Sequence, residues 1–495
     1  MNSEYVLAID QGTTNTKAAL VTTDGRIAFS ASAPMRLYQP RPGWVEQDAE
    51  EIWTSVCEVL AACVKSAASG SIAALAISNQ RETVVAWERS SGQPVAPAIV
   101  WQCRRSVDIC RELERRGVTE MLRQRTGLAV DPLFSATKIQ WLLENVEGLR
   151  ERADADEVLF GTVDSWLIWK LTGGRVYACD MSNASRTQLF NLRERTWDEE
   201  LVSLFTIPRA SLPEVRESSG AFGACSAVEG LTDVPILGAI GDSHAAMAAQ
   251  GVPASGGVKA TYGTGSSVVS LLPELRIPQA GLAATVAWSI AGDTRYALEG
   301  NISMSGAALQ WVGELLGLPD PIEGAATLAA TVENSGGVSF VPAMLGLGAP
   351  YWNSEARGVV VGLERASRGA HLARAAVEAI AHQVADVFER MEAECGSPLP
   401  ALHADGGATR NDSLMQFQAD MLDRPVLRSR VEELSIAGAA CMAGVALGWW
   451  SSPHAMAALR EPPEVFEPRM GAADRQRLRA QWKMAIECAR KRSVS

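Results

Sequence analysis

The sequence predicts a globular α/β protein whose two halves begin alike. Its 495 residues are 47% apolar, enough to bury the cores of about two to four domains. Short strand-like apolar runs alternate with segments of helical periodicity. One order of strand, glycine–threonine turn and strand occurs at the N-terminus and again near residue 260.

The first half opens with three strand-like runs and a helix. Apolar residues at 5–9 lead into the polar turn Asp10-Gln11-Gly12-Thr13-Thr14, and two further runs follow at 18–21 and 27–33. Between residues 48 and 66, apolar side chains recur every four residues, which is typical of one face of a helix. We therefore expect a β-hairpin, a third strand and a helix.

The second half repeats this opening. A strand-like run at 257–262 ends in Gly263-Thr264-Gly265-Ser266, and another apolar run follows at 268–272. Glycines and a proline gather at 248–256, between periodic segments, which favours a hinge. The sequence thus predicts an N-terminal domain of residues 1–250 and a C-terminal domain of residues 251–495.

Later segments extend the α/β pattern. Periodicity predicts helices at 305–316, 370–394 and 412–422, and apolar runs predict strands at 338–342, 358–363 and 401–407. The weakly polar stretch 436–450 contains three glycines and is shorter than the roughly 20 residues that a membrane span needs. We expect a buried helix there.

The charge and cysteine content exclude several classes of protein. A formal net charge of -12 disfavours general affinity for nucleic acid or anionic membranes. The N-terminal residues lack the basic start and long apolar run of a secretory signal, so we expect a cytoplasmic protein. Nine cysteines without CxxC spacing predict reduced thiols, and a bridge between Cys103 and Cys110 is the less favoured alternative.

Two turns have the composition of phosphate-binding loops. Gly, Thr and Ser at 12–14 and 263–266 offer backbone N–H groups and hydroxyls close together, which suits a polyphosphate. Hairpin geometry alone explains one such turn, but the recurrence in both halves favours function. Asp10, beside the first turn, is a candidate for holding Mg²⁺ through water. Its structural alternative is to cap the turn.

Asp242 is the candidate catalytic base. It follows the apolar run 237–241, and an aspartate at such a strand end between two lobes can orient and deprotonate an attacking hydroxyl. The alternative is an N-cap for the helix expected from Ser243 onward. The local pattern alone leaves both open.

Polar and charged residues follow the strand expected at 72–77. In Asn79-Gln80-Arg81-Glu82, a surface ion pair between neighbours is the default explanation. A polyol site needs the same groups, because fixed donors and acceptors must replace the water around each hydroxyl.

Distinctive motifs occur along nearly the whole chain. They are DQGTT at 10–14, NQRET at 79–83, IVWQCRR at 99–105, FGTVDSWLIW at 160–169, TYGTG at 261–265, GAPYW at 348–352, the segment 358–378, and DGGA at 405–408. In this set and order the chain resembles the FGGY carbohydrate kinases and, within that family, the glycerol kinases.

The resemblance implies a duplicated actin-like or ribonuclease-H-like α/β fold, with ATP in the cleft between two domains that close to exclude water. Carried over by position, it implies that Asp242 is the base, that Asp10 organises Mg²⁺, and that Arg81, Glu82 and Trp101 hold the polyol. The positions that it implies for the nucleotide are Gly12, Thr13, Thr14, Lys17, Thr264, Gly265, Gly306, Gln310, Gly407 and Asn411.

Three positions of the implied substrate pocket depart from the pattern typical of glycerol kinases. Leu133 stands in place of a tyrosine, Ser243 in place of a glutamine, and Ser267 in place of an aromatic residue, usually phenylalanine. The smaller side chains would hold glycerol loosely and leave room for a longer polyol or a ketose. Alternatively, neighbouring side chains or His244 compensate in an enzyme for glycerol, and the sequence leaves both interpretations open.

The leading hypothesis is ATP-dependent phosphorylation of a primary hydroxyl of glycerol or a glycerol-like polyol. A kinase for a tetritol, pentitol or ketopentose is the first alternative, and a non-catalytic nucleotide-binding sensor on the same fold is the second. The resemblance also implies a homodimer or higher homo-oligomer. Residues 221–234 lack the glycine and arginine run with which some bacterial glycerol kinases bind fructose 1,6-bisphosphate, so we do not expect that regulation.

Overall fold

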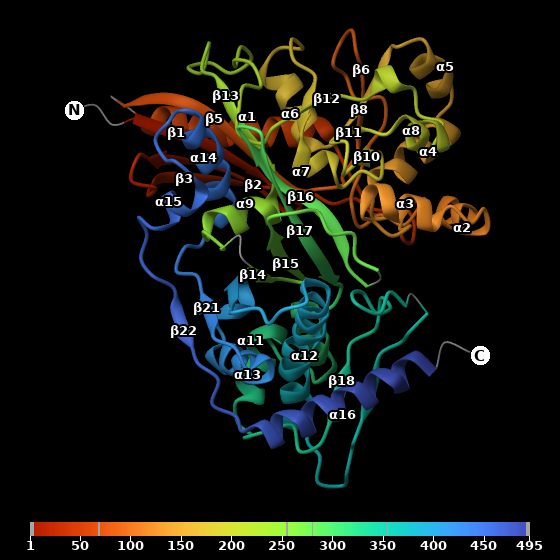
Figure 1. Ribbon diagram of the computed structural model, residues 1–495, viewed down its shortest axis with the longest axis vertical. Helices are drawn as coiled ribbons and strands as arrows, with labels where there is room; N and C mark the ends of the chain where they lie inside the picture. The colour runs from red at the N-terminus through yellow and green to blue at the C-terminus, as the bar shows by residue number, and fades with distance from the viewer. Residues whose placement is uncertain (1–3, 68–69, 254–255, 280, 354, 492–495) are drawn as a thin grey trace.

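Two β-sheets of related topology organise the chain in this computed structural model, which describes residues 4–67, 70–253, 256–279, 281–353 and 355–491 (Figure 1). In these residues the first sheet has the strand order β13–β5–β1–β2–β3. Its strands are β1 Glu4–Gln11, β2 Asn15–Thr22, β3 Ile27–Pro34, β5 Ser71–Asn79 and β13 Ile236–Gly241. The second sheet has the order β16–β17–β15–β14–β20–β21–β22. Its strands are β14 Val258–Tyr262, β15 Ser266–Leu272, β16 Ala283–Ile290, β17 Asp293–Ile302, β20 Leu402–Asp405, β21 Val426–Arg428 and β22 Glu464–Phe466.

The two sheets share one pattern of strand pairing. In the first, β3, β2 and β1 pair antiparallel, and β5 and β13 continue in parallel. In the second, β17, β15 and β14 pair antiparallel, and β20 and β21 continue in parallel. The duplication predicted from the matching openings is confirmed. The predicted hinge at 248–256 includes residues 254 and 255, which lie outside the described residues.

Helices cover both sheets. Those near the first sheet are α1 Ala49–Ala67, α9 Asp242–Ala249, α14 Leu434–Ala446 and α15 Pro453–Ala457. Those near the second are α10 Gly306–Leu315, α11 Pro321–Ala329, α12 Gly369–Cys395, α13 Asp412–Leu422 and α16 Ala472–Lys491. In Figure 1, α12, α13 and α16 occupy the lower part of the molecule and the first sheet the upper part, with β15, β16 and β17 between them.

A long insertion between β5 and β13 carries short helices and paired strands. The helices are α2 Val107–Arg115, α3 Thr119–Thr126, α4 Ser135–Asn145, α5 Leu149–Asp154, α6 Val163–Leu171, α7 Met181–Ala184 and α8 Glu199–Leu204. The strands are β6 Val85–Glu88, β7 Ala98–Ile99, β8 Val158–Gly161, β9 Ala178–Asp180, β10 Phe190–Asn191, β11 Thr196–Trp197 and β12 Glu214–Arg216; β7 pairs with β4 Glu46–Gln47. Elsewhere β18 Ser339–Val341 pairs with β19 Val359–Val361.

Strand β1 shows why its sequence is an unbroken apolar run. Leu7 and Ile9 pack in the core that includes α1, whereas Val6 and Ala8 pack in the core that includes α9 and α14. Alternate side chains of a strand point to opposite faces. Because both faces of the first sheet are covered, both sets of positions are apolar.

Helices α9 and α14 pack unusually closely. A Cβ atom built on Gly438 of α14 would lie 1.8 Å from the carbonyl oxygen of Ala245 in α9. The glycine is therefore required for the approach of the two helices. The buried helix predicted at 436–450 is confirmed as α14, but it ends at Ala446, because Gly448 has a φ of 76° and leaves the helical conformation.

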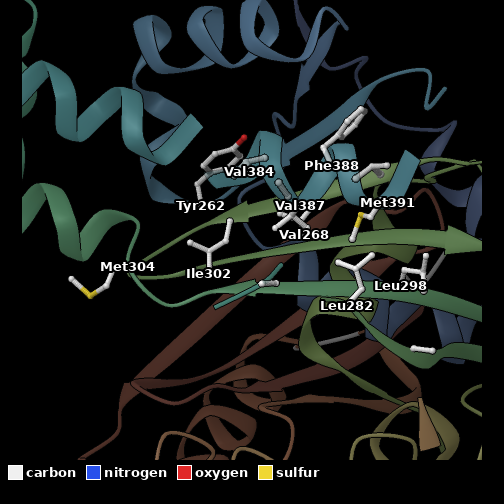
Figure 2. Close-up of a cluster of buried hydrophobic side chains, with 14 of the residues drawn as sticks. Tyr262, Val268, Leu282, Leu298, Ile302, Met304, Val384, Val387, Phe388 and Met391 are labelled. Atoms are coloured by element: carbon white, nitrogen blue, oxygen red, sulfur yellow. The ribbon is translucent and has the colours of Figure 1, made fainter. Parts of the chain in front are cut away.

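The second sheet packs on α12. Figure 2 shows Tyr262, Val268 and Leu298 of the sheet on the same side as Val384 and Phe388 of α12, among the largest set of mutually packed apolar side chains. This core supports the turn that follows Tyr262.

The cysteines and the longest helices bear on two further expectations. Cys103 and Cys110 are both free thiols, so the alternative bridge is absent. Within the described residues, no helix has the length and apolar character needed to cross a membrane.

Candidate active site

Asp242 lies where the first sheet faces the second. Strands β5 and β13 run parallel with Asn79 beside Gly241, so the residues that follow each strand emerge at the same sheet edge. Arg81 and Asp242 meet there, with 3.3 Å between Arg81 Nε and Asp242 Oδ1. The motifs that end these two strands therefore contribute to one site.

A carboxylate from the second sheet holds Arg81. Arg81 Nη1 and Nη2 donate to Glu299 Oε2 and Oε1 at 2.7 and 2.8 Å, and both side chains are almost completely buried. Arg81 Nη2 also donates to Ser243 Oγ at 3.3 Å, and Ser267 Oγ donates to Glu299 Oε1 at 3.2 Å. Two of the three unusual pocket positions thus lie against the Arg81–Glu299 pair.

Glu82 pairs with a different cation. Arg186 Nε donates to Glu82 Oε1 at 2.5 Å, and Arg186 Nη1 lies 3.2 Å from Glu299 Oε2. The default prediction of a surface ion pair between Arg81 and Glu82 is therefore wrong. Both are buried, and each pairs with a residue from elsewhere in the chain, because a charge removed from water needs an opposite charge.

The backbone at Glu82 is held in a left-handed conformation with φ of 62°, which is uncommon for a residue with a side chain. Its carbonyl accepts hydrogen bonds from Ser135 Oγ and Lys138 Nζ, each at 3.2 Å. Burial lowers the pKa of Lys138 to about 8, although the negative charge of Glu82 acts to raise it. These contacts fix the direction of the Glu82 side chain.

Five side chains form a continuous series of alternating charge, which we call the charge row. In order, the charge row is Asp242, Arg81, Glu299, Arg186 and Glu82. Burial opposes ionisation of Glu299, but Arg186 and Arg81 outweigh it and hold its pKa well below the usual range. Burial raises the pKa of Asp242, and Arg81 counteracts this. A raised pKa suits a carboxylate that must accept a proton.

Two members of the charge row, Glu299 and Arg186, were not identified from the sequence. One signal was available: Glu299 follows the buried residues Ala297 and Leu298 in β17, and a carboxylate in an apolar strand needs a partner. The partner itself has no local signal, since Arg81 and Glu299 are 218 residues apart.

The alternative of an Asp242 N-cap is wrong. Gly241 occupies the N-cap position of α9, and Asp242 is the first helical residue. Among the residues that the structure describes, Asp242 Oδ1 accepts one local hydrogen bond, from the Ser243 N–H at 2.7 Å, and contacts Arg81.

Asp10 lies within β1, opposite Lys17, so the alternative that it caps the following turn is also wrong. Its Oδ1 accepts from Ser78 Oγ at 2.9 Å. Burial and the neighbouring Asp242 raise the pKa of Asp10 to about 7. Two carboxylates that repel each other in this way gain from a nearby cation.

The residues at Asp10 fit a weakly held Mg²⁺ ion. No group of three or more His, Cys, Asp or Glu side chains in the described residues is placed to hold a metal. Mg²⁺ commonly takes one or two carboxylates and completes its shell with water and phosphate. Asp10 would be the protein's contribution to such a shell.

The first glycine–threonine turn is a hairpin turn with an exposed tip. Gly12 N–H donates to the Asn15 carbonyl at 2.9 Å, and Thr14 is exposed. Thr13 Oγ1 accepts from Trp101 Nε1 at 2.9 Å. A side chain expected at the polyol therefore contacts one expected at the nucleotide.

The second turn gathers segments that are distant in sequence. Gly306, the first residue of α10, donates its N–H to the Gly263 carbonyl at 2.9 Å, and a Cβ there would lie 2.7 Å from that oxygen. Gly406, with φ of 95°, lies against Tyr262, and a Cβ would be 2.5 Å from the tyrosine carbonyl. The residue after it, Gly407, faces open space. The predicted nucleotide residues in this region are Thr264, Gly265, Gly306 and Gly407.

Three other predicted nucleotide residues already have partners. Lys17 Nζ donates to both carboxylate oxygens of Glu433, at 2.7 and 2.9 Å. Gln310 donates to Glu314 on the exposed face of α10, and Asn411 caps α13 through its side-chain oxygen. Lys17 is thus neutralised by a residue at the start of α14.

Leu133 and His244 do not replace the missing polar groups of the pocket. Leu133 packs against a small apolar cluster of Leu128, Phe134 and Ala283. His244 is fully buried, and its ring nitrogens have no hydrogen-bond partner among the described residues. Burial and Arg81 lower the pKa of His244 well below its usual range, so the ring is neutral. The structure shows no compensation by His244.

A cavity of about 390 Å³ lies elsewhere, among α12, α13 and α16. Its arginines are already paired, Arg374 with Glu378 and Arg477 with Asp474. It is remote in the chain from the charge row and carries no candidate chemistry.

The chain is similar to known kinases in sequence and in fold. Glycerol kinase 2 of Thermotoga maritima is 46% identical over 98% of each chain, and glycerol kinase of Bacillus mycoides is 43% identical over 98% of this chain and 99% of its own. The structure of Plasmodium falciparum glycerol kinase with ADP superimposes with a TM-score of 0.92 at 31% identity, over 99% of this chain and 98% of that one. A xylulose kinase from Lactobacillus acidophilus, 22% identical, shares the fold with a TM-score of 0.89 over 99% of each chain.

The defining pattern of the N-terminal domain of FGGY carbohydrate kinases matches residues 5–249, and that of the C-terminal domain matches residues 258–447. Together these matches cover most of the chain and include every member of the charge row. The chain belongs to the FGGY family of carbohydrate kinases.

Proposed function

We propose that this protein transfers the γ-phosphoryl group of ATP to a primary hydroxyl of glycerol or a glycerol-like polyol. The observation that carries the proposal is the position of Asp242, a carboxylate of raised pKa between Asp10 and the buried Arg81. The relatives named glycerol kinases, 43–46% identical over nearly the full length, support glycerol as the first substrate to test.

In the proposed reaction, Asp242 orients the attacking hydroxyl and takes its proton as the new O–P bond forms. Arg81 and Glu82 present a fixed donor and a fixed acceptor to the other hydroxyls, and Trp101 covers the carbon chain. Mg²⁺, when bound near Asp10, would offset phosphate charge. The protein's own part is to bind, to orient and to exclude water.

The nucleotide site of the proposal uses both turns. The turns at 12–14 and 263–266 would receive the phosphates of ATP, chiefly at their exposed residues Thr14, Gly263 and Thr264. The residues that we assign to the nucleotide are Gly12, Thr13, Thr14, Lys17, Thr264, Gly265, Gly306, Gln310, Gly407 and Asn411. We further propose that the domains divide at residues 250 and 251, that the protein acts in the cytoplasm, and that it forms a homo-oligomer.

A longer polyol or a ketose is the second candidate substrate. Ser243 and Ser267 are short, half-buried side chains that contact the Arg81–Glu299 pair, Ser243 at Arg81 Nη2 and Ser267 at Glu299 Oε1. A longer acceptor would occupy the space that larger side chains would fill and would find two hydroxyl partners there.

Acceptor-dependent ADP release tests the proposal. Glycerol, tetritols, pentitols and ketopentoses are compared at one ATP and Mg²⁺ concentration, and each product is identified by mass and by phosphorus NMR. We expect phosphorylation of at least one of them at a primary hydroxyl. ADP release that no hydroxyl compound stimulates would instead support the nucleotide-binding sensor.

A further inference from the structure

The centre of the charge row is a carboxylate that no substrate role accounts for. Glu299 is completely buried and contacts two guanidinium groups, those of Arg81 and Arg186. Its strand, β17, belongs to the second sheet, whereas both arginines come from the first half of the chain. Glu299 therefore joins the two halves at the substrate end of the site.

Arg186 occupies a similar bridging place. It is completely buried, it pairs with Glu82 and Glu299, and its guanidinium carbon lies 5.1 Å from the centre of the Phe134 ring. Its Nη1 and Nη2 make no hydrogen bond within the described residues. Apart from the hydrogen bond from Nε to Glu82, the guanidinium group is therefore held at this depth by the charges of the two carboxylates.

We propose that Glu299 and Arg186 are positioning residues for acceptor binding: Glu299 holds the Arg81 guanidinium beside Asp242, and Arg186 holds the Glu82 carboxylate. This inference rests on the proposed function of Arg81 and Glu82 as polyol ligands. Each positioning residue contacts a proposed ligand through a buried ion pair and has no direct contact with the nucleotide turns in the described hydrogen bonds.

The two residues act at different places in the charge row. Glu299 fixes Arg81, which also contacts Asp242, so a change at Glu299 disturbs both acceptor binding and the base. Arg186 fixes Glu82 directly, whereas its connection to Asp242 runs through Glu299 and Arg81. A change at Arg186 therefore disturbs mainly acceptor binding. Substitutions at Glu299 should therefore change both the acceptor KM and kcat, whereas substitutions at Arg186 should change mainly the acceptor KM.

Glu299→Gln is the first test, because it removes the charge and keeps the shape. We expect the acceptor KM to rise at least about tenfold, with a lower kcat, as for loss of a hydrogen bond to a charged group. The KM for ATP should stay unchanged. Glu299→Asp keeps the charge on a shorter side chain and should recover part of both losses.

Arg186→Lys is the second test. A lysine keeps the charge but has a single ammonium group and cannot reach two carboxylates with a fork. The acceptor KM should rise about tenfold, with kcat close to that of the unchanged protein. The double variant Glu299→Gln/Arg186→Met is compared with the two single variants Glu299→Gln and Arg186→Met. The combined loss should be smaller than the product of the single losses, because the direct contact between Glu299 and Arg186 can be lost only once.

Glu378→Gln serves as the matched control. Glu378 is also buried and paired with an arginine, Arg374, but lies on α12 away from the charge row. It should lower the melting temperature without changing the acceptor KM. If Glu299→Gln does not fold, Glu299→Asp and Arg186→Lys carry the test with the same expected rise in acceptor KM.

An unchanged acceptor KM in folded Glu299 and Arg186 variants would overturn the inference. A loss in the double variant equal to the product of the two single losses would overturn it as well. The unchanged protein, assayed in parallel, keeps the two proposals apart. If it phosphorylates no polyol, the proposed function fails. If it does so and the variants match it, only the positioning role fails.

Discussion

The two ends of the candidate site are built in opposite ways. At the acceptor end, charged side chains are buried and paired with one another in the charge row. At the nucleotide end, glycines and threonines of two hairpin turns lie at the surface, and main-chain hydrogen bonds fix their shape. The acceptor end is thus organised by electrostatic pairing and the nucleotide end by backbone conformation.

This difference determines how each end should respond to substitution. A charge removed from the acceptor end leaves its buried partner unpaired, so folding stability and acceptor binding are lost together. A side chain added at the nucleotide end displaces a turn that faces solvent, so nucleotide binding is lost with less effect on stability.

Arg81→Met gives the largest expected effect. It leaves Glu299 facing Arg186 alone, and breaking a buried pair costs about 3–5 kcal/mol of the free energy of unfolding. The kcat/KM for the acceptor should fall about 10³-fold, because a proposed substrate ligand and the neighbour of the base are lost together. Chemical denaturation and initial rates measure the two losses. An Arg81→Met variant of normal stability would contradict the claim that buried ion pairs organise the acceptor end.

The pH dependence of kcat/KM for the acceptor comes next. Asp242 must be ionised to accept a proton, and burial raises its pKa, so activity should decline on acidification at a higher pH than for an exposed aspartate. Below that pKa the loss is about tenfold per pH unit.

Asp10 should add a second decline near its pKa of about 7. Because Mg²⁺ and protons compete for that carboxylate, more Mg²⁺ should move this decline to lower pH and leave the Asp242 decline in place. Profiles at two Mg²⁺ concentrations separate them. A profile that does not respond to Mg²⁺ would contradict the assignment of Asp10.

Gly306→Ala tests the nucleotide end. The new Cβ would lie 2.7 Å from the Gly263 carbonyl, which is closer than real contacts, so the second turn must shift. We expect the KM for ATP to rise about tenfold, with the acceptor KM little changed. Gly471→Ala is the control, because Gly471 lies outside both turns and a Cβ there meets nothing within 4 Å. An unchanged KM for ATP in Gly306→Ala, or an equal rise in both variants, would contradict a specific role of the second turn.

Ser243→Gln and Ser267→Phe give the smallest expected effect. Both fill space beside the Arg81–Glu299 pair, and a change in pocket size alone discriminates substrates by about 10-fold to 200-fold. The ratio of kcat/KM for glycerol to that for a pentitol should rise by about tenfold in the double variant. If the ratio stays constant, the short side chains do not set acceptor size.

Local patterns predicted much of the fold and little of the acceptor site. The continuous apolar run in β1 and the period near four in α1 identified these elements, and the repeated turn identified the duplicated sheets. The position of Asp242 at the end of β13 was also predicted. Its alternative as an N-cap was wrong because the N-cap position of α9 falls on Gly241.

Local patterns did not identify the partners of Glu299, Arg186 and Glu433. Their partners are 218, 104 and 416 residues away, and pairing at that distance depends on how the sheets pack. For the same reason Arg81 and Glu82, adjacent in sequence and opposite in charge, were wrongly expected to pair on the surface. In the structure, Arg81 pairs with the buried Glu299 and Glu82 pairs with the buried Arg186.

Phosphoryl transfer by Asp242→Asn tests the central claim most directly. The substitution keeps the shape of the side chain and removes its ability to take a proton. With ATP and glycerol, or the best acceptor, transfer should fall about 10²–10⁴-fold, the range expected for loss of a general base, while nucleotide affinity on the same sample stays within about twofold. Transfer at the rate of the unchanged protein would contradict the assignment of Asp242 as the base.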